Sequence, residues 1–458
     1  MATCPSLPPD PSKVSEAPAI RQHGALAPVS GVEPARPAKR HRFRSFLGLV
    51  GPGIITGAAN DDPTAIGTYA KCGASFGFAL LWMMPATFPM MAATVYLCSK
   101  IGMVTGQGIA GVIRSHYSRW LLYPVVAALV VANVLEAGAD ISAIAAALRL
   151  VLPIPVIGIT VGITVIVLLI QVWGSYDLIQ KIFRWLALAL FSYVAAAFLA
   201  HPHLSEVLSH TFRPAIQFHS SYLAMMVAII GTTLSPYLFF WQAGLEIEES
   251  TSLGHPRSPH HAGASNHELR SAALDVSIGM LFSSLISYFI VLGTAATLFK
   301  AGEKQVETAA QAAQALRPVA GDAATWLFAA GVIGVGILAV PVLTTGAAYA
   351  LAETFEWKTG LNHTPEHAKE FYAVIALATC VALAIGFSGI NPINALFWAG
   401  LIMGLLAPPI MLVIMLITNN RRVMGSQANG IGVNVLGWGT TVAISGATFG
   451  LLWSWLIP

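Results

Sequence analysis

Long apolar stretches, separated by short polar segments, dominate the chain from Phe46 onward. Most of them hold about 20 residues, the length of an α-helix that crosses the hydrocarbon core of a bilayer. Their apolar residues do not alternate with polar ones, as the strands of a membrane β-barrel require. The pattern predicts an all-α polytopic membrane protein with about 11 transmembrane helices. These are expected at about 46–70, 76–99, 120–149, 156–174, 180–200, 220–245, 271–299, 323–354, 371–388, 392–418 and 431–456.

Residues 1–44 differ in composition from the rest of the chain. Pro, Ala and Ser are frequent, no apolar run is sustained, and basic residues gather near the end of the segment. Such a segment buries too little apolar surface to offset the entropy of ordering, so we expect a disordered basic tail. The remainder divides into a helical core at 45–420 and one additional helix at 431–458.

The distribution of positive charge predicts the orientation. Most of the 24 Lys and Arg residues fall in the tail or in loops that the helix count places on the same side as the tail. Loops rich in Lys and Arg stay on the cytoplasmic side of a membrane. We therefore expect an integral protein of the cell (inner) membrane with a cytoplasmic N-terminus and an external C-terminus.

Composition excludes other classes. Hydrophobic residues make up 56% of the chain and charged residues only 10%, whereas soluble proteins carry about 25% charged residues. This excludes a soluble multidomain protein, a wholly disordered chain and a nucleic-acid binder. The four Cys residues form no CxxC motif, so neither a disulfide framework nor a cysteine metal cluster is indicated.

Two apolar stretches, the first and the sixth, are interrupted by proline, at Pro63 and at Pro236. Proline lacks an amide donor and clashes with the preceding turn, so each helix is expected to break just before it. Broken helices at corresponding places in two halves are typical of inverted-repeat transporters. The repeats would cover about 45–200 and 219–420, although two ordinary proline kinks would give the same pattern.

Two acidic residues, Asp61 and Asp62, occupy the first interruption. A carboxylate inside a bilayer costs roughly 2.5–3.5 kcal/mol, so a pair of them needs water or a cation as a partner. Carbonyls at a helix break lack amide partners and can join a carboxylate in binding a hard divalent cation. The alternatives are a solvated helix terminus for Asp61 and an N-cap for Asp62.

The second interruption offers similar donors. It contains the carbonyl groups near Gly231 and Thr232 and the hydroxyl groups of Thr232, Thr233, Ser235 and Tyr237. These are hard oxygen ligands, the kind that Mg²⁺ and Mn²⁺ accept. We therefore expect a divalent cation to bind between the two breaks.

Three motifs together resemble the natural resistance-associated macrophage protein (NRAMP) family of divalent metal transporters. They are G-P-G-x-x-x-G-x-x-x-D-D-P at 51–63, G-x-V-T-G-Q-G at 102–108 and G-T-T-L-S-P-Y at 231–237. The resemblance implies a LeuT-type fold with a 5+5 inverted repeat, in which broken helices 1 and 6 hold the metal. It also implies that Asp62 binds the metal and that Ala59 and Thr232 supply carbonyl oxygens.

The chain departs from the family at three positions. The family's Asn, Met and His fall on Ala65, Ser235 and Tyr237. A thioether favours softer transition metals, whereas a hydroxyl does not. In lacking the Met, the chain is similar to the NRAMP-related magnesium transporters, so we expect Mg²⁺ or Mn²⁺ as substrate, with Ser235 and Tyr237 in the site. Whether Asp61 also binds the metal stays open.

The third apolar stretch carries Asn133, Glu136 and Asp140 at spacings that place them on one helix face. Acidic residues here belong to the family's proton pathway; Glu136 matches one of them and Asn133 replaces the other. We therefore expect weak or absent proton coupling. The alternatives are a polar contact between helices and an ordinary proton-coupled Mn²⁺/Fe²⁺ symporter.

Two rival functions remain. The G-x-S-G sequence at 386–389 is typical of intramembrane serine proteases, but no histidine lies in a predicted membrane helix to act as base. We therefore expect no enzyme and no cofactor, with the metal as cargo and no protein partner indicated. An amino-acid transporter on the same fold is the second rival, although two acidic residues would repel a substrate carboxylate. Glu246, Glu248 and Glu249 are expected to form a solvated rim.

Overall fold

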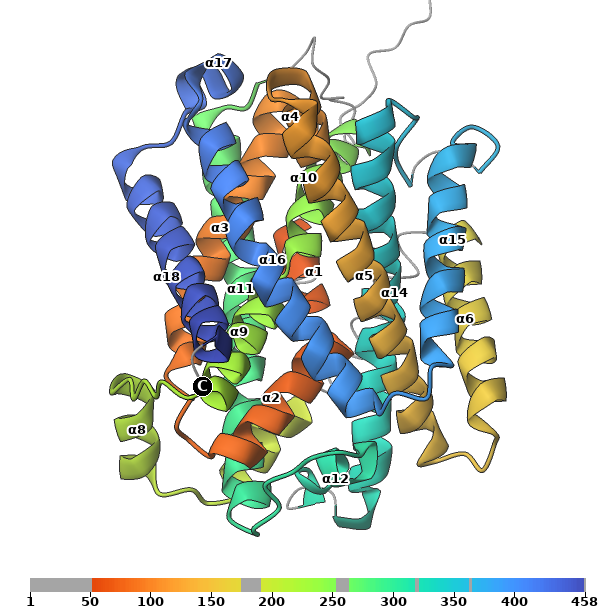
Figure 1. The fold of residues 1–458 in the computed structure, drawn as a ribbon, viewed down its shortest axis with the longest axis vertical. Coiled ribbons are helices and arrows are strands. Elements are labelled where there is room, and N and C mark those ends of the chain that lie inside the picture. Colours follow the sequence, from red (N-terminus) through yellow and green to blue (C-terminus); the bar gives the residue numbers. More distant parts are fainter. Residues whose placement is uncertain (1–51, 174–190, 253–262, 318–320, 362–364, 457–458) are drawn as a thin grey trace, which may run out of the picture. The chain divides into compact units, whose positions relative to one another are not determined.

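The computed structural model describes residues 52–173, 191–252, 263–317, 321–361 and 365–456 (Figure 1). Every described residue belongs to one compact unit, 50–458. The expected tail at 1–44, the start of the first expected helix and residues 180–190 of the fifth lie outside the described residues.

All regular elements in the described part of the chain are helices. The first apolar stretch forms α1 (Pro52–Ala59) and α2 (Pro63–Phe76), and the sixth forms α9 (Ser220–Thr233) and α10 (Pro236–Ser252). The other long helices are α3 (Met83–Thr105), α5 (Arg119–Arg149), α6 (Val156–Trp173), α11 (Asn266–Thr294) with the π-helical turn η2 (Ala295–Phe299), α14 (Ala324–Phe355), α15 (Lys369–Gly386), α16 (Pro392–Asn419) and α18 (Ile431–Leu456). The connections contain α4 (Ile109–His116), α8 (Leu204–Phe212), α12 (Ala309–Gln314), α17 (Arg421–Met424) and the 3-10 turns η3 (Gly321–Ala323) and η4 (Gly425–Gln427).

Within the described residues, 8 helical stretches are long and apolar enough to cross a membrane. The first apolar stretch is not among them because each of its halves is short, and α6 has a shorter apolar part, Val156–Gln171. The fifth expected helix is described only at 191–199, where it is helical. The first, fourth and fifth expected helices therefore account for the difference between these 8 spans and the 11 that were predicted.

The half-helices pack at backbone distance against their neighbours. A Cβ atom on Gly231 of α9 would lie 1.9 Å from the carbonyl oxygen of Gly400 in α16. A Cβ atom on Gly57 of α1 would lie 2.3 Å from the carbonyl oxygen of Gly279 in α11. Small residues allow helix backbones in membranes to approach this closely. Glycine at these positions therefore fixes α1 and α9 inside the bundle.

The surrounding helices pack against one another and against the half-helices. Helix α5 packs against α14, α15 and α16, whereas α1 packs against α11, and α10 packs against α3 and α14. Figure 1 shows α4 and α17 at one end of the bundle and α8 and α12 at the other. We call these the α4 end and the α12 end. The two helix breaks lie between them, inside the helix bundle.

Candidate metal site at the helix breaks

The first break forms because Asp62 and Pro63 start a new helix. Pro63 is the first residue of α2, a position where the missing amide hydrogen leaves no bond unmade. Asp62 Oδ1 accepts a hydrogen bond from the Ala65 amide at 2.7 Å and so caps α2. The N-cap role that the sequence left as an alternative is therefore present. The second carboxylate oxygen of Asp62 is free to contact another element.

The second break lies between Thr233, the last residue of α9, and Pro236, the first of α10. The Ser235 hydroxyl lies 2.8 Å from the Gly231 carbonyl oxygen and 3.0 Å from that of Thr232, and it donates its proton toward them. The predicted donors Thr232 and Ser235 therefore contact each other. Carbonyls at a helix C-terminus carry partial negative charge, which favours a cation nearby.

Tyr237 joins the two breaks. Its hydroxyl lies 2.9 Å from Asp62 Oδ2 and 3.1 Å from the Ala59 carbonyl oxygen. All three residues are buried. A phenol has one proton, so it can donate to only one of these oxygens at a time. The hydroxyl thus lies between two of the predicted metal ligands, where it holds them together in this conformation.

Asp61 faces away from Tyr237. Its Oδ1 accepts a hydrogen bond from Ser283 of α11 at 2.9 Å, and its Oδ2 has no hydrogen-bond partner among the described residues. Adjacent carboxylates therefore have different surroundings: Asp62 contacts α2 and α10, whereas Asp61 contacts α11. The contacts join Asp62, Ala59 and Tyr237, but they do not bring Asp61 into the same group.

The polar residues of α5 surround the first break on another side. Asp140 Oδ1 accepts a hydrogen bond from Thr64 at 2.8 Å, and Asn133 donates to the Leu343 carbonyl of α14 at 3.0 Å. In the part of the chain that the structure describes, both carboxylate oxygens of Glu136 and Oδ2 of Asp140 lack a hydrogen-bond partner. All three α5 residues are fully buried. The structure thus links Asp140 directly to the start of α2, two residues after Asp62.

Four buried carboxylates therefore lie near the breaks: Asp61, Asp62, Glu136 and Asp140. Over the residues that the structure describes, none of them forms an ion pair or hydrogen bond with Lys or Arg. A buried negative charge without a positive partner is unfavourable by several kcal/mol. A cation that enters the bundle would supply the missing charge.

Sequence reasoning missed three side chains in this region: Asn60, Thr64 and Ser283. Thr64 binds Asp140, and Ser283 binds Asp61 and lies 3.0 Å from the Asn60 amide nitrogen. Serines 283 and 287, one helix turn apart in an apolar stretch, were a usable signal, because they place two hydroxyls on one face. Asn60 and Thr64 had no signal beyond their place beside the aspartates.

The expected solvated rim on α10 is wrong for Glu246, whereas Glu248 and Glu249 are partly exposed. Glu246 is buried and accepts hydrogen bonds from Ser99 of α3 at 2.6 Å and from Gln242 at 2.9 Å. Glu248 accepts a hydrogen bond from the Leu361 amide at 2.7 Å and another from Tyr349. The prediction failed because hydropathy marks the end of a helix but does not show which neighbours cover it.

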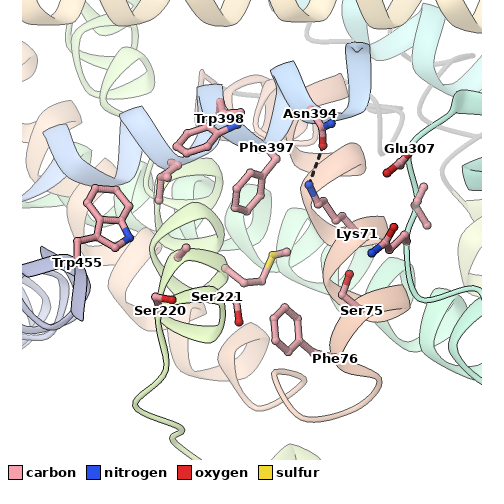
Figure 2. Close-up of a pocket in the computed structure, with 15 residues that line it drawn as sticks. Lys71, Ser75, Phe76, Ser220, Ser221, Glu307, Asn394, Phe397, Trp398 and Trp455 are labelled. Carbon is pink, nitrogen blue, oxygen red and sulfur yellow. Dashed lines mark hydrogen bonds between the residues drawn. The ribbon is translucent and has the colours of Figure 1, made fainter. Parts of the chain in front are cut away.

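A pocket of about 520 Å³ opens at the α12 end, between α2, α9, α16, α18 and residues 305–307. Figure 2 shows Lys71 in its wall, hydrogen-bonded to Asn394 of α16 at 2.9 Å. The Lys71 ammonium also lies 4.4 Å from the centre of the Phe397 ring. Trp398 and Trp455 line the same pocket. None of the break residues lines it, so the Asp62 region is closed from this pocket in this conformation.

Most of the chain is similar in sequence to known proteins. Residues 53–454 match the family described as "Natural resistance-associated macrophage protein-like". The divalent metal cation transporter MntH of Verminephrobacter eiseniae is 26% identical over 409 residues, which cover 87% of each chain. The protein of the same name from Mycobacterium leprae is 26% identical over 407 residues, 87% of this chain and 89% of that one.

Solved structures show the same fold. The manganese transporter of Eremococcus coleocola, in complex with an aromatic bis-isothiourea substituted compound, has a TM-score of 0.69 at 18% identity, covering 92% of this chain and 93% of that one. MhsT in complex with L-phenylalanine has a TM-score of 0.58 at 11% identity, covering 90% and 98%. With the observed broken helices, these similarities confirm the LeuT-type fold that was predicted.

Proposed function

The chain belongs to the natural resistance-associated macrophage protein-like family, whose named relatives are membrane transporters and not enzymes, and on that premise we propose that it moves divalent metal cations across the membrane. The observation that carries the proposal is Asp62. Its carboxylate lies buried in a helix break beside the Ala59 carbonyl and the Tyr237 hydroxyl, and no Lys or Arg of the described residues contacts it. The metal is the cargo, and no resident cofactor is part of the proposal.

The proposed ligands are Asp62, the carbonyls of Ala59 and Thr232, and the hydroxyls of Ser235 and Tyr237. All are oxygen donors. In the described conformation the Tyr237 hydroxyl bridges Asp62 and the Ala59 carbonyl. Its proton must therefore turn away from both oxygens before a metal can bind them. Movement of the half-helices against the surrounding helices would then open the site to one side of the membrane at a time.

The all-oxygen donor set supports Mg²⁺ and Mn²⁺ as substrates. Sulfur from a methionine on the sixth helix would favour softer metals, and Ser235 stands at that position. Magnesium keeps several of its waters when it binds, which suits a site with small hydroxyl side chains. Membership of the branch that resembles the NRAMP-related magnesium transporters is part of this proposal. A relative from Eremococcus coleocola is named a manganese transporter.

The direction of transport is proposed as into the cytoplasm. With the N-terminus inside the cell membrane, the α12 end faces outward and its pocket is the candidate entrance. We also propose that the chain consists of a cytoplasmic tail at 1–44, inverted repeats at about 45–200 and 219–420, and an additional helix at 431–458. An inside-negative membrane potential then supplies energy for the uptake of a divalent cation.

Proton coupling is proposed to be weak or absent because Asn133 replaces an acidic residue and donates to the Leu343 carbonyl. The alternative is a proton-coupled Mn²⁺/Fe²⁺ symporter of the ordinary type. One observation favours this alternative: both carboxylate oxygens of Glu136 are buried and unpartnered, as a proton carrier would require.

Amino-acid transport is the weaker second alternative. MhsT, which is similar in fold, was solved with L-phenylalanine. A bound amino acid needs a favourable contact for its carboxylate, such as a helix N-terminus. Here the N-terminus of α2 is already capped by Asp62, and Asp61 precedes it. Both negative charges would repel the substrate carboxylate.

Metal uptake into proteoliposomes tests the proposal. The parent protein is expected to take up Mg²⁺ and Mn²⁺, and Asp62→Ala to take up neither. Asp62→Asn is the matched variant, because asparagine can still cap α2 but carries no charge. Loss of uptake in both variants supports metal binding by the carboxylate. Normal uptake by Asp62→Asn, or no uptake of any divalent metal by a folded parent, would contradict the proposal.

A further inference from the structure

The surroundings of Asp61 are not explained by a single metal site at Asp62. Asp61 is 1% exposed, and only one of its two carboxylate oxygens has a hydrogen-bond partner. Leaving a buried charged acceptor unpaired is costly. The carboxylate points to α11, away from the Tyr237 hydroxyl that contacts Asp62. A cation on the α11 side of the break would satisfy this oxygen.

Proton counting around Ser283 leads to the same result. The Ser283 hydroxyl lies 2.9 Å from Asp61 Oδ1 and 3.0 Å from the side-chain amide of Asn60. It has one proton to donate. If that proton goes to Asp61, the Asn60 nitrogen must point to Ser283. The Asn60 oxygen then lies 3.3 Å from the carbonyl oxygens of both Thr232 and Thr233.

Three acceptor oxygens in such proximity repel one another unless something positive lies among them. The other assignment of the Asn60 amide gives its nitrogen to the carbonyls of Thr232 and Thr233 and its oxygen to Ser283. Ser283 then has no proton left for Asp61, which loses its hydrogen bond. Amide orientations are assigned from such networks, and here either assignment leaves at least one acceptor oxygen of the cluster without a donor, a place that a cation can fill.

Other oxygen atoms gather at the same place. The Tyr69 hydroxyl of α2 lies 2.8 Å from Thr233 Oγ1, and Ser287 lies one helix turn after Ser283. Ser287 lies beside both Asp61 and Tyr69. Oxygen donors of this kind suit hard cations. Asn60, the residue after α1, lies 3.3 Å from the last carbonyls of α9, and the partial negative charge of that helix end adds to the attraction.

We propose that Asp61, Asn60 and Ser283, with the carbonyls of Thr232 and Thr233, bind a second cation, Na⁺, and that metal transport depends on its binding. A single carboxylate balances one positive charge, so a monovalent ion leaves the buried cluster neutral. This inference rests on the proposed transport function and adds a second ion to it.

The two ion sites share backbone, which provides the coupling. Thr232 offers its carbonyl to the proposed metal site and also lies beside Asn60. Asp61 and Asp62 are neighbours in one short break, and their negative charges repel each other. A cation bound to Asp61 reduces this repulsion and so favours the charged form of Asp62 that binds the metal. A cation at Asp61 is therefore expected to strengthen metal binding, and the metal must strengthen Na⁺ binding by the same factor.

Thermal unfolding in detergent tests binding without any transport. NaCl is compared with KCl and choline chloride at equal ionic strength. We expect Na⁺ alone to raise the unfolding midpoint of the parent by about 3 °C, because a ligand of the folded state stabilises it. Asp61→Asn and the pair Ser283→Ala with Ser287→Ala should lose this rise. Ser284→Ala should keep it, because the Ser284 hydroxyl donates instead to the Met84 carbonyl at 3.1 Å.

Metal flux in proteoliposomes tests the dependence. Na⁺ should raise the initial rate of Mn²⁺ uptake by the parent about tenfold over choline, a typical coupling magnitude. The serine variants should lose the effect even if Asp61→Asn fails to fold. Uptake that ignores Na⁺, or a Na⁺ effect that persists in the serine variants, would overturn the inference while leaving the metal-transport proposal intact. A Na⁺-specific midpoint shift lost in the serine variants, with no metal uptake in any salt, would instead support the Na⁺ site and contradict the transport function.

Discussion

Neighbouring residues in the first break have different chemical surroundings. Asp62 caps α2 with one oxygen and contacts Tyr237 with the other, whereas Asp61 turns to Ser283. The backbone of Asp62 is extended, with φ of −68° and ψ of 173°, which turns its side chain away from that of Asp61, and the packing of α10 and α11 then supplies the different partners. Single-atom changes at these residues should therefore have separable effects.

Ser235 provides a selectivity prediction. Ser235→Met places a thioether in the break and removes a hydroxyl, so uptake of Cd²⁺ and Fe²⁺ should increase several-fold relative to Mg²⁺. Competition among the metals in proteoliposomes measures the ratio. Ser250→Met is the control, because the Ser250 hydroxyl also bonds a carbonyl, that of Ile247 at 2.8 Å, at the far end of α10. An unchanged ratio in Ser235→Met would argue against contact between Ser235 and the metal.

Tyr237 provides a prediction about affinity. Its hydroxyl bonds two proposed ligands, and a hydrogen bond to a charged group contributes about 1.5–3 kcal/mol. Tyr237→Phe removes this proposed metal ligand, so the KM for Mn²⁺ uptake should rise by about tenfold or more. Tyr222→Phe is the matched control, since Tyr222 is also buried and donates to a backbone carbonyl far from the breaks, that of Ala215. A lower KM would mean instead that the Tyr237 hydroxyl only competes with the metal for Asp62 and Ala59.

At the scale of elements, the half-helices are short and depend on their neighbours for position. Helix α1 has 8 residues and α9 has 14, and helices of this length are marginal by themselves. Close contacts through glycine hold α9 against α16 and α1 against α11. The geometry of the proposed metal site is therefore set by packing against helices that carry none of its ligands.

Gly231 tests this dependence. An added Cβ would meet the Gly400 backbone at 1.9 Å, and overpacking of this kind typically costs 1–3 kcal/mol or more. Gly231→Ala should lower the unfolding midpoint in detergent and reduce metal uptake. Gly162→Ala on α6 is the control, because nothing lies within 4 Å of the added atom. Equal behaviour of the two variants would show that backbone contact does not position α9.

At the scale of the whole molecule, the distribution of charge determines what drives transport. A divalent cation gains about 4.6 kcal/mol from an inside-negative potential of 100 mV. Uptake of Mg²⁺ should therefore follow an imposed potential without a pH gradient, with equal Na⁺ on both sides. A pH-sensitive dye inside the liposomes should show no acidification. Acidification that accompanies metal entry would support the proton-coupled alternative, with Glu136 as its carrier.

Much of the fold and part of the site could be predicted from the sequence. Apolar stretches of bilayer length determine the helices, and Pro63 and Pro236 determine where two of them break, because both effects act within a few residues. The presence of acidic residues in one break is likewise a property of the sequence, and it indicated a cation. The depth of Glu246, by contrast, was misjudged from hydropathy alone.

Only the tertiary structure decided which partner each polar group has. The Asp62 contact with Tyr237 joins residues 175 apart, and the Asp61 contact with Ser283 joins residues 222 apart. Such distant pairings depend on how whole helices pack, and packing depends on the shapes of many side chains at once. The sequence alone therefore determined that charged groups lie within the membrane helices. Tertiary packing decided that the two adjacent aspartates face different helices.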